Sequence, residues 1–224
     1  MSTDRVIESR PLRSRPRVFV VARNVVLIVA TATVLTDLVQ VVTIITGRTL
    51  FSFGGADPRL PLSYLPQLNQ ADLQDGATGT LADASLLLRI VCALPSLIHA
   101  VTIVLATIYL LRVLRGIAQA QPFHPVVLTS WRHLSIVLLV GGLVQALVDT
   151  IAVVYLSTGV GLLYGTWNEG PDGQENFLGG DYQGISIDLP QWPFTIIIAG
   201  LVALALTAAF RAGARLEKDA DGVV

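Results

Sequence analysis

Charged residues are scarce in this chain. Only 14% of its 224 residues are Asp, Glu, Lys or Arg, whereas 53% are hydrophobic, and the mean hydropathy is +0.66. A soluble domain of this size cannot bury that much apolar surface. The composition therefore excludes an ordinary water-soluble domain and predicts a membrane protein. The formal net charge of −1 gives no sign of direct nucleic-acid binding.

Cysteine and catalytic motifs are also nearly absent. Cys92 is the single cysteine and lies in an apolar run, so the chain has no disulfide framework and no cysteine-based metal site. The GxxxxGK(S/T), HExxH and GxSxG patterns of phosphate binding and hydrolysis do not occur. Four acids near the last span could bind a divalent cation, but their spacing fits no EF-hand loop, so a solvated acidic loop is the favoured interpretation. They are Asp172, Glu175, Asp181 and Asp188. We expect no enzymatic activity, no metal and no other cofactor.

Four apolar runs are long enough to cross a bilayer, whose hydrocarbon core of ~30 Å needs ~20 helical residues. They cover about 18–46, 86–111, 134–162 and 194–210. The first run is about twice as long as the roughly 7–15-residue core of a signal peptide and lacks a cleavage site, so we expect a retained span. The predicted fold is an all-α antiparallel bundle of four transmembrane helices over 18–211. A disordered basic arm, 1–17, precedes it and a cytoplasmic tail, 212–224, follows.

The distribution of basic residues predicts the orientation. The N-terminal arm including Arg23 holds six Lys or Arg, the connector between the second and third spans holds three, and the tail holds three, whereas the two longer loops hold only Arg48 and Arg59. Basic segments stay in the cytoplasm, so both termini are expected there and the longer loops on the other side. Glycine-rich turns in these loops predict a short strand pairing, around 49–53 with 184–189.

The basic connector carries the most distinctive local pattern. Gly116 and Pro122 are expected to stop the second helix, and Pro125 suits the first turn of the third. Aromatic and basic residues then mark the headgroup level. The predicted docking hairpin for a cytoplasmic partner consists of Arg112, Arg115, Pro122, Phe123, Trp131 and Arg132.

The connector pattern LLRxLRxIAxxxPF, the run LLLRIVCALPSLIHA and the tail FRAGARLEKDADGVV resemble the bacterial membrane proteins catalogued as domain of unknown function 2975. The resemblance covers about residues 86–224. It implies a four-helix protein of the bacterial inner, or plasma, membrane, often encoded near a small helix-turn-helix regulator and without an agreed activity. Where the family usually has an asparagine and two arginines after the turn, this chain has Val127, Thr129 and Ser130.

Polar residues recur on one face of three spans. At ~1.5 Å per residue, Asp37, Asp149 and Arg89 lie roughly 18, 22 and 25 Å from the inner boundary. A lone charge in hydrocarbon costs roughly 2.5–3.5 kcal/mol, so Arg89 is predicted to pair with one or both aspartates. A structural ion pair is the favoured interpretation, and a proton relay through His99 or an outward-pointing Arg89 are the alternatives. The predicted polar cluster is Asp37, Gln40, Arg89, His99, Gln145 and Asp149.

Two function classes remain open. The first is a sensor or accessory protein that couples the membrane or extracytoplasmic state to a cytoplasmic partner, and the second is a small transporter or proton-coupled carrier that uses the polar cluster. A water-filled cavity reaching Asp37 and Asp149 favours the carrier, and a dry ion pair favours the sensor. The expected partners are the lipid bilayer and a cytoplasmic regulator, and a homo-oligomer is left open. On the last span, Ala199, Ala203 and Thr207 predict a close helix-packing face.

Overall fold

Four long helices dominate the computed structural model, which describes residues 16–50, 57–119, 124–162 and 170–221. Each is long and apolar enough to cross a membrane, which confirms the four predicted spans. They are α1 (Pro16–Thr46), α2 (Leu86–Ala118), α3 (Pro125–Gly159) and α5 (Phe194–Asp221). The shorter elements are a 3₁₀ turn η1 (Leu62–Tyr64), β1 (Leu68–Leu73), α4 (Gly170–Leu178) and β2 (Tyr182–Ile187).

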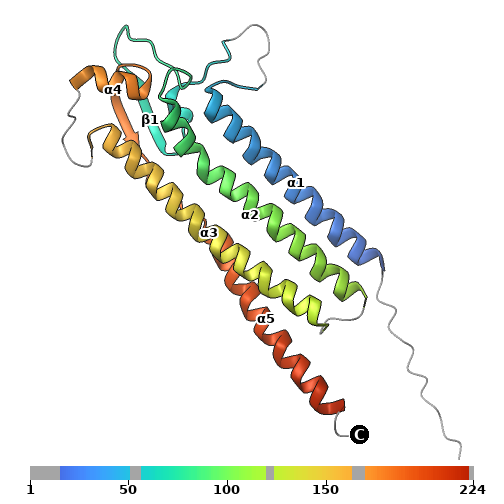
Figure 1. Ribbon diagram of the computed structural model, residues 1–224. Coiled ribbons are helices and arrows are strands. Elements are labelled where there is room, and N and C mark those ends of the chain that lie inside the picture. The colour runs from blue at the N-terminus through green and yellow to red at the C-terminus, as the bar shows by residue number, and fades with distance from the viewer. Residues whose placement is uncertain (1–15, 51–56, 120–123, 163–169, 222–224) are drawn as a thin grey trace, which may run out of the picture.

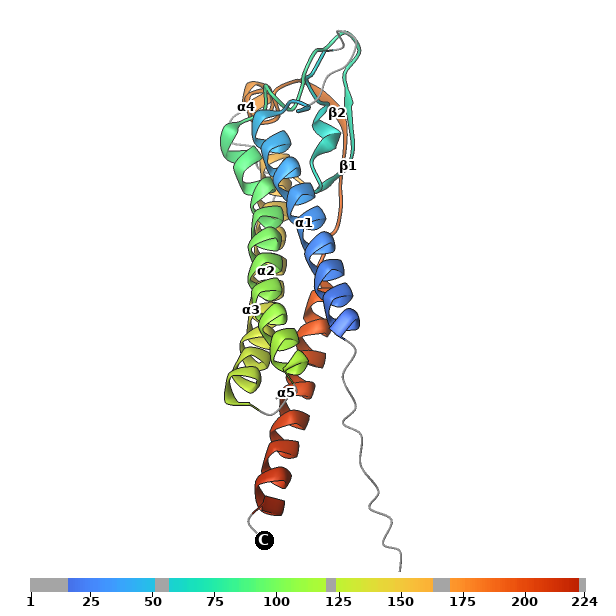
Figure 2. The same cartoon turned by 90° about the vertical axis from the view of Figure 1, so that its right-hand side faces the viewer.

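The helices form an open row, in which α1 packs on α2, α2 on α3, and α3 on α5 (Figure 1). We call the end that holds β1, β2 and α4 the loop end, and the end where α2 connects to α3 the connector end. Helix α5 does not run the full length of the row. It begins about halfway along α3 and extends beyond the other helices at the connector end (Figures 1 and 2).

The second helix is longer than predicted. Helix α2 continues through Gly116 to Ala118, so the prediction that Gly116 stops it is wrong. This glycine instead allows α2 and α3 to approach, because a Cβ atom there would lie 2.1 Å from Cγ2 of Val127. Helix α3 begins at Pro125, as predicted, and the side chain of His124 accepts a hydrogen bond from the N–H of Val126 at 3.3 Å. Pro122 and Phe123 lie outside the described residues.

The small sheet differs in one strand from the predicted pairing. Strand β2 lies where a strand was expected, but its antiparallel partner is β1, with Leu68 opposite Ile187 and Leu73 opposite Tyr182. Of the predicted partner, 49–53, residues 51–53 lie outside the described residues, and the backbone N–H of Thr49 donates to the carbonyl oxygen of Pro58. The sequence of β1, LNQADL, has no β-branched or aromatic residue and therefore gives no strand signal. Its position follows from the preceding turn, whose Leu62 and Leu65 are each only 1% exposed.

The main hydrophobic core lies at the loop end, between the helices and the loops. Ile44 of α1, Leu88 of α2 and Leu156 of α3 are fully buried there, together with Leu178 of α4. Burying one such side chain stabilises a fold by roughly 1.5–3 kcal/mol. The loop segments therefore fill the space beside α1, α2 and α3 that α5, which starts lower, leaves open.

The connector end has a smaller core of Ala106, Leu134 and Ala203. Helix α5 packs there through small residues, and two of the three predicted positions, Ala203 and Thr207, lie on the packing face. Ala199 is exposed, whereas Gly200, Ala203 and Thr207 are buried. Gly200 is required at this position because a Cβ atom would lie 2.8 Å from Cγ of Leu139.

Candidate functional site

A polar cavity of about 200 Å³ lies where the loop segments meet the helices. Its polar lining comes from α1, α2 and α3 and from two loop segments: Asp37, Gln40, Gln67, Ser96, His99, Gln145, Asp149 and Gln191. At ~1.5 Å per residue, Asp37 and Asp149 lie roughly 14–15 Å from the loop ends of their helices. The adjacent residues Leu38 and Leu147 are 42% and 60% exposed on the outer surface of the same helices. Apolar side chains of α1 and α3 therefore face outward near the level of the cavity.

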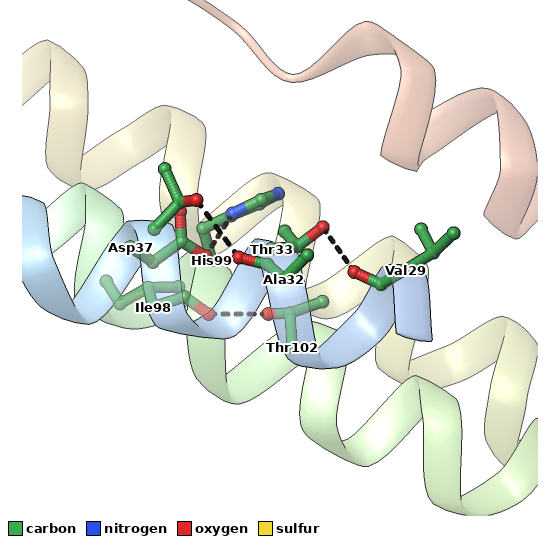
Figure 3. Close-up of polar contacts among 8 residues, drawn as sticks. Val29, Ala32, Thr33, Asp37, Ile98, His99 and Thr102 are labelled. Carbon is green, nitrogen blue, oxygen red and sulfur yellow. Dashed lines mark hydrogen bonds and ion pairs between the residues drawn. The ribbon is translucent and has the colours of Figure 1, made fainter. Parts of the chain in front are cut away.

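His99 and Asp37 form a direct pair across the interface of α1 and α2. Nδ1 of His99 lies 2.7 Å from Oδ2 of Asp37, and the two side chains are 24% and 11% exposed (Figure 3). It is the one side-chain ion pair found among the described residues. This pair joins α1 and α2 directly within the cavity.

Nearby hydroxyl groups do not extend this pair into a relay. Thr33 donates to the carbonyl oxygen of Val29 at 3.0 Å, and Thr102 donates to that of Ile98 at 2.8 Å (Figure 3). Each hydroxyl proton is thus committed to the backbone of its own helix.

Asp149 is held by groups from both loops. Its Oδ2 accepts a hydrogen bond from the backbone N–H of Gln191 at 2.7 Å, and its Oδ1 accepts one from Nε2 of Gln67 at 3.2 Å. Residues 188–193 are not helical, yet they reach the depth of Asp149. Pro190 and Pro193 suit this position because they bring no N–H group that needs a partner.

Gln67 connects the first loop to the helices. It is only 2% exposed, and its Nε2 lies 3.2 Å from Oδ1 of Asp149 and 3.4 Å from the carbonyl oxygen of Cys92. Since both neighbours are acceptors, the amide must present its NH₂ group to them. Its Oε1 is left buried without a donor, and so is Oε1 of Gln145. Two amide oxygens of the cavity lining are therefore buried without a donor.

Arg89 is not part of the cavity, and the predicted pairing with Asp37 or Asp149 is wrong. The Nη1 atom of Arg89 donates to the carbonyl oxygen of Ile45 at 2.8 Å. The last four carbonyl groups of a helix have no partner within it, and Ile45 lies in the last turn of α1. The guanidinium group therefore caps α1 at the loop end, about 12 Å in helix rise above the level of Asp37.

The other predicted members of the polar cluster do come together. Asp37, Gln40, His99, Gln145 and Asp149 all line the cavity. Gln67 and Gln191 were missed because they lie in loops, far in sequence from their partner Asp149. A signal was available, since both follow a proline in the same tripeptide, Leu65-Pro66-Gln67 and Leu189-Pro190-Gln191.

The docking hairpin has aromatic contacts that hold three helices together at the connector end. Trp131 stacks on Phe210 at 5.8 Å between ring centroids, and Tyr109 stacks on His133 at 5.3 Å. The guanidinium carbon of Arg112 lies 5.4 Å from the centre of the Tyr109 ring. Arg112, Arg115 and Arg132 are exposed, and none pairs with a carboxylate among the described residues.

Comparison with known proteins assigns no family. No family model, no curated protein and no solved structure matches this chain. Within the described parts of the chain, no three His, Cys, Asp or Glu side chains gather as metal ligands. The functional argument therefore depends on the geometry of the cavity.

Proposed function

We propose that this chain is a non-enzymatic, four-span protein of a bacterial plasma membrane, with both termini in the cytoplasm and the loop end outside. The four apolar helices and the concentration of Lys and Arg in the arm, connector and tail support this orientation. The resemblance to domain of unknown function 2975 supports the same cellular location.

Its role is that of a sensor, and its input is the protonation of the cavity from the outer side. The observation that carries this proposal is the His99–Asp37 pair, 2.7 Å apart, in a cavity built jointly by spanning helices and outer loops. A change of charge there alters the attraction between α1 and α2 directly. Helix α2 continues to the exposed Arg112 and Arg115, so a shift of this helix would reach the docking hairpin and a cytoplasmic regulator.

A proton-coupled carrier is the second candidate, favoured by a cavity that reaches both Asp37 and Asp149. The packing at the connector end favours the sensor. The core there is apolar, and its buried hydroxyl groups all donate to carbonyl groups of their own helices: Ser130, Ser135 and Thr207. A carrier needs a route to both sides, and these residues offer no polar path between the cavity and the connector end.

The experiment monitors the connector while the outer pH changes. A cysteine placed by Ala118→Cys is labelled with an environment-sensitive dye in right-side-out proteoliposomes; the native Cys92 is buried and protected. An outer step from pH 7.5 to 5.5 should change the dye emission. His99→Gln and Asp37→Asn should abolish the change, and the control Asp75→Asn, at an exposed acid of the first loop, should retain it.

A pH dye inside the same vesicles separates the two candidates. A sensor gives the emission change without proton uptake, whereas sustained uptake that depends on His99 would establish the carrier. An emission change that persists in His99→Gln would reject the cavity as the input site.

A further inference from the structure

Asp149 is placed as a negative charge without a positive partner. An ionised carboxylate is an acceptor only, whereas a protonated one donates with one oxygen. Both oxygens of Asp149 accept hydrogen bonds, from Gln191 and Gln67, which is the arrangement that stabilises the ionised form. No arginine, lysine or histidine of the described chain forms an ion pair with it. A buried charge of this kind needs a counter-charge from elsewhere.

Two further acceptors in the same cavity lack donors. Oε1 of Gln67 and Oε1 of Gln145 are buried without a hydrogen-bond partner. Gln67 is bonded to Asp149, and Gln145 lies one helical turn before Asp149 on the same face of α3. Buried polar groups in native proteins are nearly always satisfied. The two unpartnered amide oxygens, beside a carboxylate that no basic side chain of the described residues pairs with, point to a positively charged ligand.

We propose that this part of the cavity binds a monovalent cation, with the Asp149 carboxylate as its counter-charge and the amide oxygens of Gln67 and Gln145 as further ligands. Asp37 already forms an ion pair with His99. Asp149 is the other carboxylate of the cavity, and no basic side chain of the described residues pairs with it. Calcium takes about 6–8 oxygens and usually several carboxylates, so a single charge fits better. The shared chemistry is that of Na⁺, K⁺ or a small ammonium ion.

The size of the cavity agrees with this class of ligand. Its volume of about 200 Å³ is below the ~300–1,000 Å³ of pockets for drug-sized ligands. One water occupies ~30 Å³ in the liquid, so an ion with several waters has room. Bound there, the cation would strengthen the junction at Asp149, where both loops attach to α3. The inference rests on the proposed function in that the cavity must be open to the outer side.

The first measurement is thermal unfolding of the full chain in nanodiscs at constant pH and ionic strength. Chloride salts of Na⁺, K⁺, ammonium and methylammonium are compared with that of N-methyl-D-glucamine, a cation too bulky for the three ligand groups to surround. At about tenfold excess over its Kd, a bound ion should raise Tm by about 3–6 °C. The cation that raises Tm at the lowest concentration is the one that the cavity binds most tightly. Equal Tm values in all five salts would overturn the proposal.

Variants locate the site. Asp149→Asn should weaken the apparent cation affinity at least tenfold, and Gln145→Leu should weaken it severalfold. Because Gln145→Leu removes a buried acceptor without a partner, it should fold even if Asp149→Asn does not. The control Asp75→Asn removes an exposed acid of the first loop and should leave the response unchanged. An unchanged cation affinity in Gln145→Leu would reject the assigned ligand set.

Two measurements on the His99→Gln variant distinguish the cation site from the sensor proposal. His99→Gln should lose the dye response to outer pH and keep the Tm response to the cation. A cation response without any pH response would reject the sensor and retain the cation site. A dye response to outer pH, together with equal Tm values in all the salts, would reject the cation site and retain the sensor.

Discussion

The loop half and the connector half of the helix row are stabilised in different ways. In the loop half, large aliphatic side chains such as Ile44, Leu88 and Leu156 are completely buried by loop segments. In the connector half, small residues let α5 approach α3, and most large apolar side chains face outward, where lipid solvates them. The packing of the loop half thus resembles the core of a soluble protein. The packing of the connector half resembles that between helices of a membrane protein.

The polar cavity lies where one kind of packing gives way to the other. Helix α5 starts at Phe194, just after Gln191 contacts Asp149, and its first turns meet α3 near Gly142. A full-length α5 would occupy the space that the extended segment 188–193 now shares with the cavity. The late start of α5 is what makes room for polar groups at this depth.

The largest expected effect concerns the sides of the membrane on which the two halves lie. An alkaline-phosphatase fusion at Gly173 should be active, because that reporter folds only outside the cytoplasm, and a fusion at Ala118 should be inactive. Enzyme activity in whole cells, normalised to expression, is the measurement. The reverse pattern would invert the orientation of both halves and place the cavity nearer the cytoplasm.

The next effect tests the soluble-like core of the loop half. Leu156→Ala should destabilise the protein by about 2–5 kcal/mol, because it leaves a cavity among fully buried side chains. The control Leu147→Ala, on the same helix at a position that is 60% exposed, should cost much less. Denaturant unfolding in detergent measures both. Equal losses would mean that lipid-facing and loop-facing packing contribute alike.

An effect of similar size tests the turn that leads α1 into the loop half. Gly47 has φ = +66°, and a Cβ atom there would lie 2.3 Å from the backbone nitrogen of Ala82. Gly76 has φ = +84° with open space around it. Gly76→Ala should cost roughly 1–2 kcal/mol for the left-handed backbone alone. Gly47→Ala should cost about 1–3 kcal/mol more, because backbone must move. Thermal unfolding compares the two, and similar losses would contradict the close approach.

The smallest effect at neutral pH concerns Tyr182 in β2. Its buried hydroxyl has no hydrogen-bond partner, so Tyr182→Phe should change stability by less than about 0.5 kcal/mol. Burial, and secondarily the charge of Asp83, raises the pKa of Tyr182 from 10.0 to about 12. The folded state therefore keeps its proton between these values while the unfolded state loses it, and stability falls as the pH rises from 10 to 12. The variant should show a shallower fall in a pH series of unfolding measurements.

The sequence alone determined the four helices and much of the cavity. Apolar runs of 17 or more residues leave few alternatives to spanning helices, because backbone groups must be satisfied within the bilayer. The helical period also placed Asp37, His99, Gln145 and Asp149 on faces that meet, since residues three or four apart share a side of a helix. These are local rules, and they hold whatever the rest of the chain does.

Only the tertiary structure decided which of these polar groups are partners. Arg89 caps α1 through Ile45 instead of pairing with an aspartate, because the offset between helices puts the free carbonyl groups of α1 within its reach. Gln67 and Gln191 reach Asp149 because the loops descend beside α3 where α5 is absent. Such contacts depend on helix offsets and loop paths, and no periodicity along the chain records either.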